Sequence, residues 1–185
     1  MDITSFKRLL LENFPTDLPD ASCLFEGVRI ESGHEKLEFL TSVEWPELSI
    51  EMMSQMAGEF WQLSSVWMKY YLPTFMTFTS DLELEVQFFG KPPSQFAEIT
   101  NEDQDTLIDC LFGYWCSMDN LIHRRFEIED NCFYGLSSRQ ADLVEIWLQK
   151  MDFKALQKAD IFPEGFDVSD ECINNFIFLV KKHAI

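Results

Sequence analysis

Two adjacent tyrosines and a histidine are the side chains of this chain that would suit a small-molecule site. Tyr70 and Tyr71 precede Pro73 in the apolar stretch LSSVWMKYYLPTFMTF, and His123 follows later in the chain. A buried tyrosine hydroxyl needs a polar partner, so one hypothesis is a small enzyme with a pocket at Pro73, lined by Tyr70, Tyr71, His123 and carboxylates. The alternative, which we favour, is that the aromatic side chains of this stretch form the wall of the core.

The other reactive side chains form no established catalytic or metal-binding pattern. The three histidines are far apart in sequence and belong to no zinc or calcium motif. Asp119 lies four residues before His123, a spacing that suits a surface ion pair or a helix cap as well as an oriented imidazole. Cys116 or Cys132 would have to meet His123 in space to act as a nucleophile with its base, and we expect structural thiols instead. We therefore assign no catalytic, metal-binding or cofactor-binding residue.

Carboxylates are the most abundant charged groups. The chain has 32 aspartates and glutamates but only 14 lysines and arginines, which gives a net charge of −18. A surface of this charge repels phosphate backbones and anionic lipids, so we expect neither direct nucleic-acid binding nor membrane binding. It would attract a basic protein, although solubility alone is the simpler explanation of the charge. Two acidic segments could receive such a partner, formed by Glu98, Glu102, Asp103, Asp105 and Asp109, and by Glu127, Glu129 and Asp130.

Length, cysteines and the N-terminal segment predict one cytoplasmic domain. A chain of 185 residues with 46% hydrophobic residues is long enough for a single core, so we expect one domain over residues 1–185. Five cysteines form no C-x-x-C pair, and their odd number argues against a disulfide framework. Charged residues interrupt the first fourteen positions, so we expect no secretion signal. Lys69 stands at the centre of the longest apolar run, which favours a core segment over a membrane span.

Hydrophobic spacing predicts a mainly α fold, a single compact helical domain of about six helices with one or two short strands. We expect helices over 3–13, 34–43, about 47–57, 137–151 and 169–183, and another from Thr100 or Asn101 to Met118. Residues 15–33 are rich in turn formers and should hold no regular helix, although Phe25, Val28 and Ile30 would suit a short strand. Residues 90–100 should form a loop, because two adjacent prolines exclude both helix and central strand.

The helix prediction for the middle of the chain depends on the effect of Pro73. Proline lacks an amide hydrogen and clashes with the carbonyl four residues before it, so a helix through Trp67 to Tyr71 should kink or end near Leu72. A second helix could then begin with Pro73 in its first turn and continue to about residue 85. At the later helix start, Ser137 and Gln140 have the spacing of a capping box.

The order of several of these motifs resembles that of a family of small acidic bacterial proteins of unknown function with a YYLPAFM-like core. The resemblance rests on Trp45-Pro46, on Tyr70-Tyr71-Leu72-Pro73 with Phe75 and Met76, and on F-x-x-L-S-x-x-Q at residues 133–140. It covers about residues 35–152, and Thr74 departs from it where a small residue such as alanine is expected. The resemblance implies a shared fold in bacteria and assigns no catalytic residues.

Taken together, the residues predict a non-enzymatic, acidic interaction protein that binds a basic protein partner, as an immunity protein or a nucleic-acid mimic would. The net charge of −18 without a catalytic motif is the basis of this hypothesis. The enzyme with a pocket at Pro73 is one alternative. A subunit that self-associates through exposed aromatic side chains is another.

Overall fold

A computed structural model describes residues 2–26, 34–49, 52, 60–81, 114, 118, 122, 131–151 and 169–185. Within these ranges every regular element is an α-helix or a 3-10 helix, which confirms the predicted mainly α class. The predicted strand residue Phe25 is not in a strand, and Val28 and Ile30 lie outside the described ranges. The same described ranges contain no helix with the length and hydrophobicity needed to cross a bilayer.

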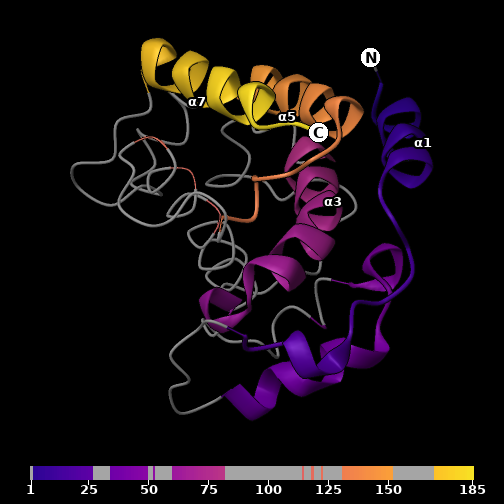
Figure 1. The fold of residues 1–185 in the computed structure, drawn as a ribbon. Helices are drawn as coiled ribbons and strands as arrows, with labels where there is room; N and C mark the ends of the chain where they lie inside the picture. The colour runs from indigo at the N-terminus through magenta and orange to yellow at the C-terminus, as the bar shows by residue number, and fades with distance from the viewer. Residues whose placement is uncertain are drawn as a thin grey trace, which may run out of the picture.

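Helix α3, Ser65–Asp81, runs through the middle of the molecule and contacts α1, α5 and the 3-10 helix η3 (Figure 1). Its side chains from Leu72 to Met76 are all buried. The sequence predicts a kink or an end near Leu72. The helix continues through Pro73, so the end is wrong, as is the second helix starting at Pro73, and the kink stays a prediction. Proline inside a helix costs about 3 kcal/mol, and burial of the side chains on both sides of Pro73 offsets that cost.

The N-terminal helix α1, Ile3–Asn13, has the predicted bounds. The carboxylate of Asp2 caps it by accepting a 3.0 Å hydrogen bond from the backbone N–H of Ser5. Phe6, Leu10 and Phe14 are buried, and α1 packs against α3 and α5. The spacing of these apolar residues therefore predicted both the helix and the face that it buries.

Three short 3-10 helices follow α1 along the chain. They are η1 (Ala21–Cys23), η2 (His34–Ser42) and η3 (Trp45–Glu47). The second one confirms the helical turns predicted over 34–43, with Leu37 and Leu40 buried. A fourth short 3-10 helix, η4 (Phe60–Gln62), directly precedes α3.

The helix predicted over 47–57 begins too early. Glu47 ends η3, and Leu48 has an extended backbone with φ −66° and ψ 112°. The hydroxyl of Ser49 accepts a hydrogen bond from the backbone N–H of Met52, as an N-cap residue does. The helical turn that contains Met52 therefore begins after Ser49, and the remainder of the predicted range lies outside the described residues.

Helices α5, Ser138–Lys150, and α7, Asp170–Lys182, lie side by side and confirm the two predicted C-terminal helices (Figure 1). The predicted capping box is present, because Ser137 and Gln140 each accept a hydrogen bond from the other's backbone N–H. The backbone of Ile185 pairs with Leu136 and Ser138, which places the last described residue beside the start of α5. Of the helix predicted from about 100 to 118, only Tyr114 and Met118 are described, and both are helical and buried.

Candidate functional site

None of the acidic residues predicted to receive a partner lies in the described part of the chain. This holds for His123 of the predicted pocket as well. The acidic surfaces at 98–109 and 127–130 therefore stay predictions. The residues outside the described ranges are Glu98, Glu102, Asp103, Asp105, Asp109, His123, Glu127, Glu129 and Asp130.

Tyr70 and Tyr71 are both buried on α3, and their hydroxyl groups are bound to backbone carbonyls. The Tyr71 hydroxyl lies 2.8 Å from the carbonyl oxygen of Leu40 and 2.6 Å from that of Val43. Burial raises the pKa of Tyr71 far above its ordinary value. Its hydroxyl therefore holds the end of η2 against α3 as a neutral group, which supports the core-wall interpretation for this residue.

Tyr70 binds a different part of the chain. Its hydroxyl donates a 2.6 Å hydrogen bond to the carbonyl oxygen of Thr16 and accepts a 3.3 Å bond from the backbone N–H of Trp45. Burial is the main reason that the pKa of Tyr70 is raised, and the negative charges of Glu44, Asp17 and Glu47 raise it further. Three exposed carboxylates thus lie close enough to one buried hydroxyl to influence its ionisation.

Other polar groups on α3 also bind backbone carbonyls of distant segments. The hydroxyl of Thr74 donates a 2.6 Å bond to the carbonyl oxygen of Trp45, and the indole N–H of Trp67 donates a 3.3 Å bond to that of Asp20. The ammonium group of Lys69 binds the carbonyl oxygen of Tyr134, and its partial burial lowers the pKa of Lys69. Helix α3 therefore positions the connecting segments through hydrogen bonds as well as through apolar contacts.

We call Asp17, Glu44 and Glu47 the Tyr70 acidic cluster, because their charges raise the pKa of Tyr70, whose hydroxyl bonds the neighbouring residues Thr16 and Trp45. Glu44 and Glu47 lie at the two ends of η3, and Asp17 lies in the segment that follows α1. All three side chains are exposed. Sequence reasoning missed this cluster because Asp17 lies 27 positions before Glu44 and 30 before Glu47. All three stand in short segments that contain proline, TDLP and EWPE.

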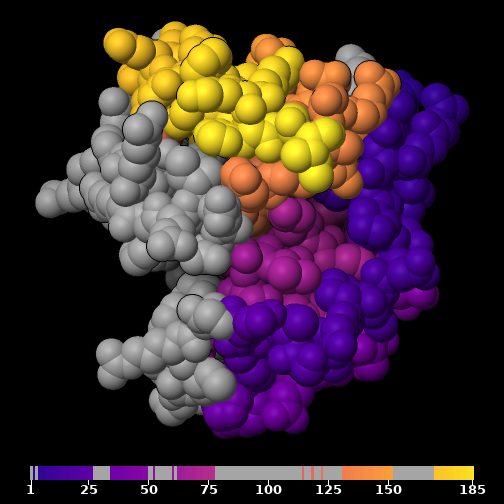
Figure 2. Space-filling view, in the orientation of Figure 1, coloured from indigo at the N-terminus to yellow at the C-terminus, as the bar shows by residue number. Residues whose placement is uncertain are grey.

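The Tyr70 acidic cluster belongs to a larger acidic surface. Residues 2–26 and 34–49 carry nine carboxylates, all exposed, and three cationic side chains. These segments form one side of the molecule in Figure 2, at its right and lower edges. The nine carboxylates are those of Asp2, Glu12, Asp17, Asp20, Glu26, Glu35, Glu38, Glu44 and Glu47.

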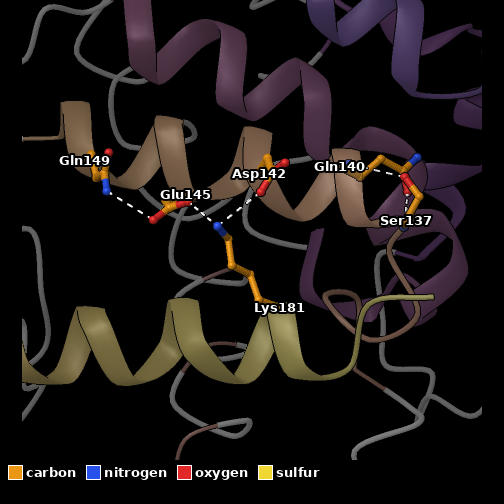
Figure 3. Close-up of polar contacts among 6 residues, drawn as sticks. All are labelled: Ser137, Gln140, Asp142, Glu145, Gln149 and Lys181. Atoms are coloured by element: carbon orange, nitrogen blue, oxygen red, sulfur yellow. Dashed lines mark hydrogen bonds and ion pairs between the residues drawn. The ribbon is translucent and has the colours of Figure 1, made fainter.

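The C-terminal helices have balanced charges. Residues 131–151 and 169–185, which include α5 and α7, carry four carboxylates and four lysines or arginines. Lys181 of α7 lies 3.1 Å from the carboxylate of Asp142 and also binds that of Glu145, both on α5 (Figure 3). These hydrogen bonds raise the pKa of Lys181. Some charged side chains of α5 and α7 therefore pair with each other across the two helices. The carboxylates of residues 2–26 and 34–49 are exposed to solvent.

Reactive groups in the described residues do not converge. No three of the described histidine, cysteine, aspartate or glutamate side chains are placed to hold a metal ion. Of the described cysteines, Cys132 is buried, and Cys23 and Cys172 are half-buried. Within the described residues, the features that could meet another molecule are the acidic surface and a few exposed apolar side chains. The latter are Leu11, Val66, Phe178 and Ile185.

Comparisons of this chain with models of protein families, with curated proteins and with solved structures found no match. The resemblance to a bacterial family with a YYLPAFM-like core accordingly stays a prediction.

Proposed function

We propose that this chain is a non-enzymatic interaction protein of the bacterial cytoplasm that binds a basic protein partner through the acidic surface of its N-terminal half. The observation that supports the proposal most directly is the uneven distribution of charge. Residues 2–26 and 34–49 carry nine exposed carboxylates and only three cationic side chains, whereas α5 and α7 carry equal numbers of negative and positive side chains. An exposed surface with this excess of negative charge attracts and orients a cationic partner.

The arrangement of Tyr70 and Tyr71 favours this function over the alternative enzyme. Both hydroxyls bind backbone carbonyls, and burial raises the pKa of each tyrosine, so neither is poised as a base near neutral pH. The acidic surface requires no such group. An immunity protein or a nucleic-acid mimic would use a surface of this charge to cover the cationic site of its partner, and we propose a role of this kind.

A capture experiment with charge-matched variants tests the proposal. Immobilised protein is exposed to native bacterial lysate at low and high salt, and the bound proteins are identified by mass spectrometry. We expect basic proteins that elute at high salt, because attraction between exposed charges weakens as salt is added. Glu44→Gln/Glu47→Gln should reduce their recovery severalfold more than Asp170→Asn/Glu171→Gln. The second double variant removes the same charge from the first turn of α7. Equal recovery with both double variants, or no salt-sensitive protein at all, would contradict the proposal.

A further inference from the structure

Residues 15–20, PTDLPD, form a connecting segment with a bend at Asp17, which we call the strap. It connects α1 to η1 and contains no helix or strand. Pro15 and Pro19 fix their own φ angles near −65° and favour extended backbone in the residues before them. Phe14, with φ −110° and ψ 138°, and Asp20, with φ −59° and ψ 124°, show that both ends of the strap are extended.

The strap is held by side-chain donors that bind its backbone carbonyls. The indole N–H of Trp45 donates to the carbonyl oxygen of Pro15 at 2.9 Å, and the hydroxyl of Tyr70 donates to that of Thr16 at 2.6 Å. The indole N–H of Trp67 donates to the carbonyl oxygen of Asp20 at 3.3 Å. Beneath the strap, Trp67 and Tyr70 pack edge to face, with ring centroids 5.8 Å apart.

In each of these hydrogen bonds the acceptor is a backbone carbonyl oxygen of the strap, and none involves a side chain of the strap. Leu18 is half-buried and packs against the core, and Pro15, Asp17 and Asp20 are exposed. Trp45, Trp67 and Tyr70 are buried. Aromatic surfaces with hydrogen-bond donors are the means by which proteins bind proline-rich peptides in the polyproline II conformation, whose carbonyls have no internal partner. Another extended peptide that contains proline would present the same acceptors.

We propose that Trp45, Trp67 and Tyr70 form a binding site for a proline-containing basic peptide segment of a partner protein, and that the strap occupies this site until the partner displaces it. The proposal rests on the proposed function and specifies which part of a basic partner is bound.

The charge around the strap indicates why the partner segment is basic. The Tyr70 hydroxyl bonds both Thr16, next to Asp17, and Trp45, next to Glu44, so Asp17 of the strap lies near the carboxylates of η3. The negative charge of Asp17 is therefore repelled by the negative charges of Glu44 and Glu47. A peptide with lysine or arginine at this position would gain attraction where the strap meets repulsion.

Three labelled peptides, measured by fluorescence anisotropy with the full chain at low salt, test the site. They are FPTKLPK, a basic form of residues 14–20, its glycine form FGTKLGK with the same charge, and the native FPTDLPD. We expect FPTKLPK to bind at least about tenfold more tightly than FPTDLPD and about fivefold more tightly than FGTKLGK, because it combines matching charge with a preformed extended backbone.

Variants of the strap distinguish a peptide that displaces the strap from a peptide that binds elsewhere on the acidic surface. Asp17→Lys makes the strap a better occupant and should weaken FPTKLPK binding about tenfold. Glu38→Lys makes the same change of charge on an exposed side chain of η2 and should weaken it much less. Pro15→Gly/Pro19→Gly makes the strap more flexible when free, so it should strengthen binding of FPTKLPK.

Four results would overturn the proposal. Equal binding of FPTKLPK and FGTKLGK would mean that charge alone is recognised, which leaves the proposed function standing without this site. Equal effects of Asp17→Lys and Glu38→Lys would show that the strap is not displaced. Dimerisation of Pro15→Gly/Pro19→Gly in light scattering, without tighter peptide binding, would assign the site to the strap of a second copy. If no peptide binds while the lysate capture recovers salt-sensitive basic proteins, the inference fails and the proposed function does not.

Discussion

The hydroxyl of Thr74 donates a 2.6 Å hydrogen bond to the backbone carbonyl of Trp45, 29 positions earlier in the chain. Thr74 is buried on α3, one residue after Pro73, and Trp45 is the first residue of η3. The bond therefore joins the proline-containing helix to the segment that carries Glu44 and Glu47. It also gives a structural reason for threonine at the position where the suggested bacterial family is expected to have a small residue.

We predict that Thr74→Ala lowers the free energy of unfolding by about 1–2 kcal/mol, because the carbonyl of Trp45 loses a donor in a buried site. Thr74→Ser keeps the hydroxyl and should cost less. Chemical denaturation of the two variants measures the difference. If Thr74→Ala and Thr74→Ser are equally stable, the hydrogen bond does not contribute, and the position requires only a small side chain.

Tyr71→Phe should lower the free energy of unfolding by about 1–3 kcal/mol at neutral pH, since the carbonyls of Leu40 and Val43 lose their common donor. Burial raises the pKa of Tyr71 in the folded protein. The stability that Tyr71 contributes is therefore complete below the pKa of about 10 in the unfolded chain and is lost as the pH rises above it.

Urea denaturation of the native protein and of Tyr71→Phe between pH 7 and pH 11 measures this dependence. The difference in stability between the two proteins should be constant up to about pH 9.5 and should shrink above about pH 10. A difference that stays constant up to pH 11 would show that the Tyr71 hydroxyl is not protected from ionisation by the fold.

Gln140→Ala should destabilise the protein by about 1–2 kcal/mol, because Gln140 has two roles. Its side-chain oxygen accepts from the backbone N–H of Ser137, and its amide nitrogen donates to the carbonyl of Asn13 at 2.8 Å. Gln149→Ala is the control on the same helix, because Gln149 is exposed and binds Glu145 at 3.3 Å.

Gln140→Glu separates the two roles of Gln140. Glutamate can still accept from the N-cap residue in a capping box, but it cannot donate to Asn13. We expect thermal unfolding to place Gln140→Glu between the native protein and Gln140→Ala. A Gln140→Glu variant as stable as the native protein would assign the whole contribution to the capping box.

Lys181→Ala should cost no more than about 1 kcal/mol, because Lys181 and its partners Asp142 and Glu145 are partly exposed to solvent. The cost should decrease in 1 M salt, since added ions screen exposed charges. Lys182→Ala, measured by the same denaturation experiment, is the control next to it. A salt-independent loss larger than 2 kcal/mol would indicate that Lys181 contributes mainly through packing of its aliphatic chain.

Local signals in the sequence were sufficient for α1, α5 and α7. Each has apolar residues at helical spacing and a capping residue, Asp2, Ser137 or Ser169, at its start. Short-range hydrogen bonds and one buried face decide such helices, and both can be read from residues close in sequence. The mainly α class follows from the same signals.

Propensity alone was insufficient around Pro73 and Pro46. An isolated helix would be disrupted by proline, yet α3 continues through Pro73 because its flanking side chains are buried by other segments. Pro46 lies in η3, so the next helix begins after Ser49 and not at 47. In both places tertiary packing and a local cap determined the boundary.

The sequence by itself determined that this chain is acidic, helical and built around the aromatic stretch at 63–78, because composition and periodicity are properties of residues in order. Only the tertiary structure decided that Asp17, Glu44 and Glu47 gather around the hydroxyl of Tyr70, and that Trp45, Trp67 and Tyr70 hold residues 15–20. These contacts join residues about 23 to 54 positions apart, so no local pattern specifies them. They form because buried donors on α3 and η3 require acceptors, and the nearest free carbonyls belong to distant segments of the chain.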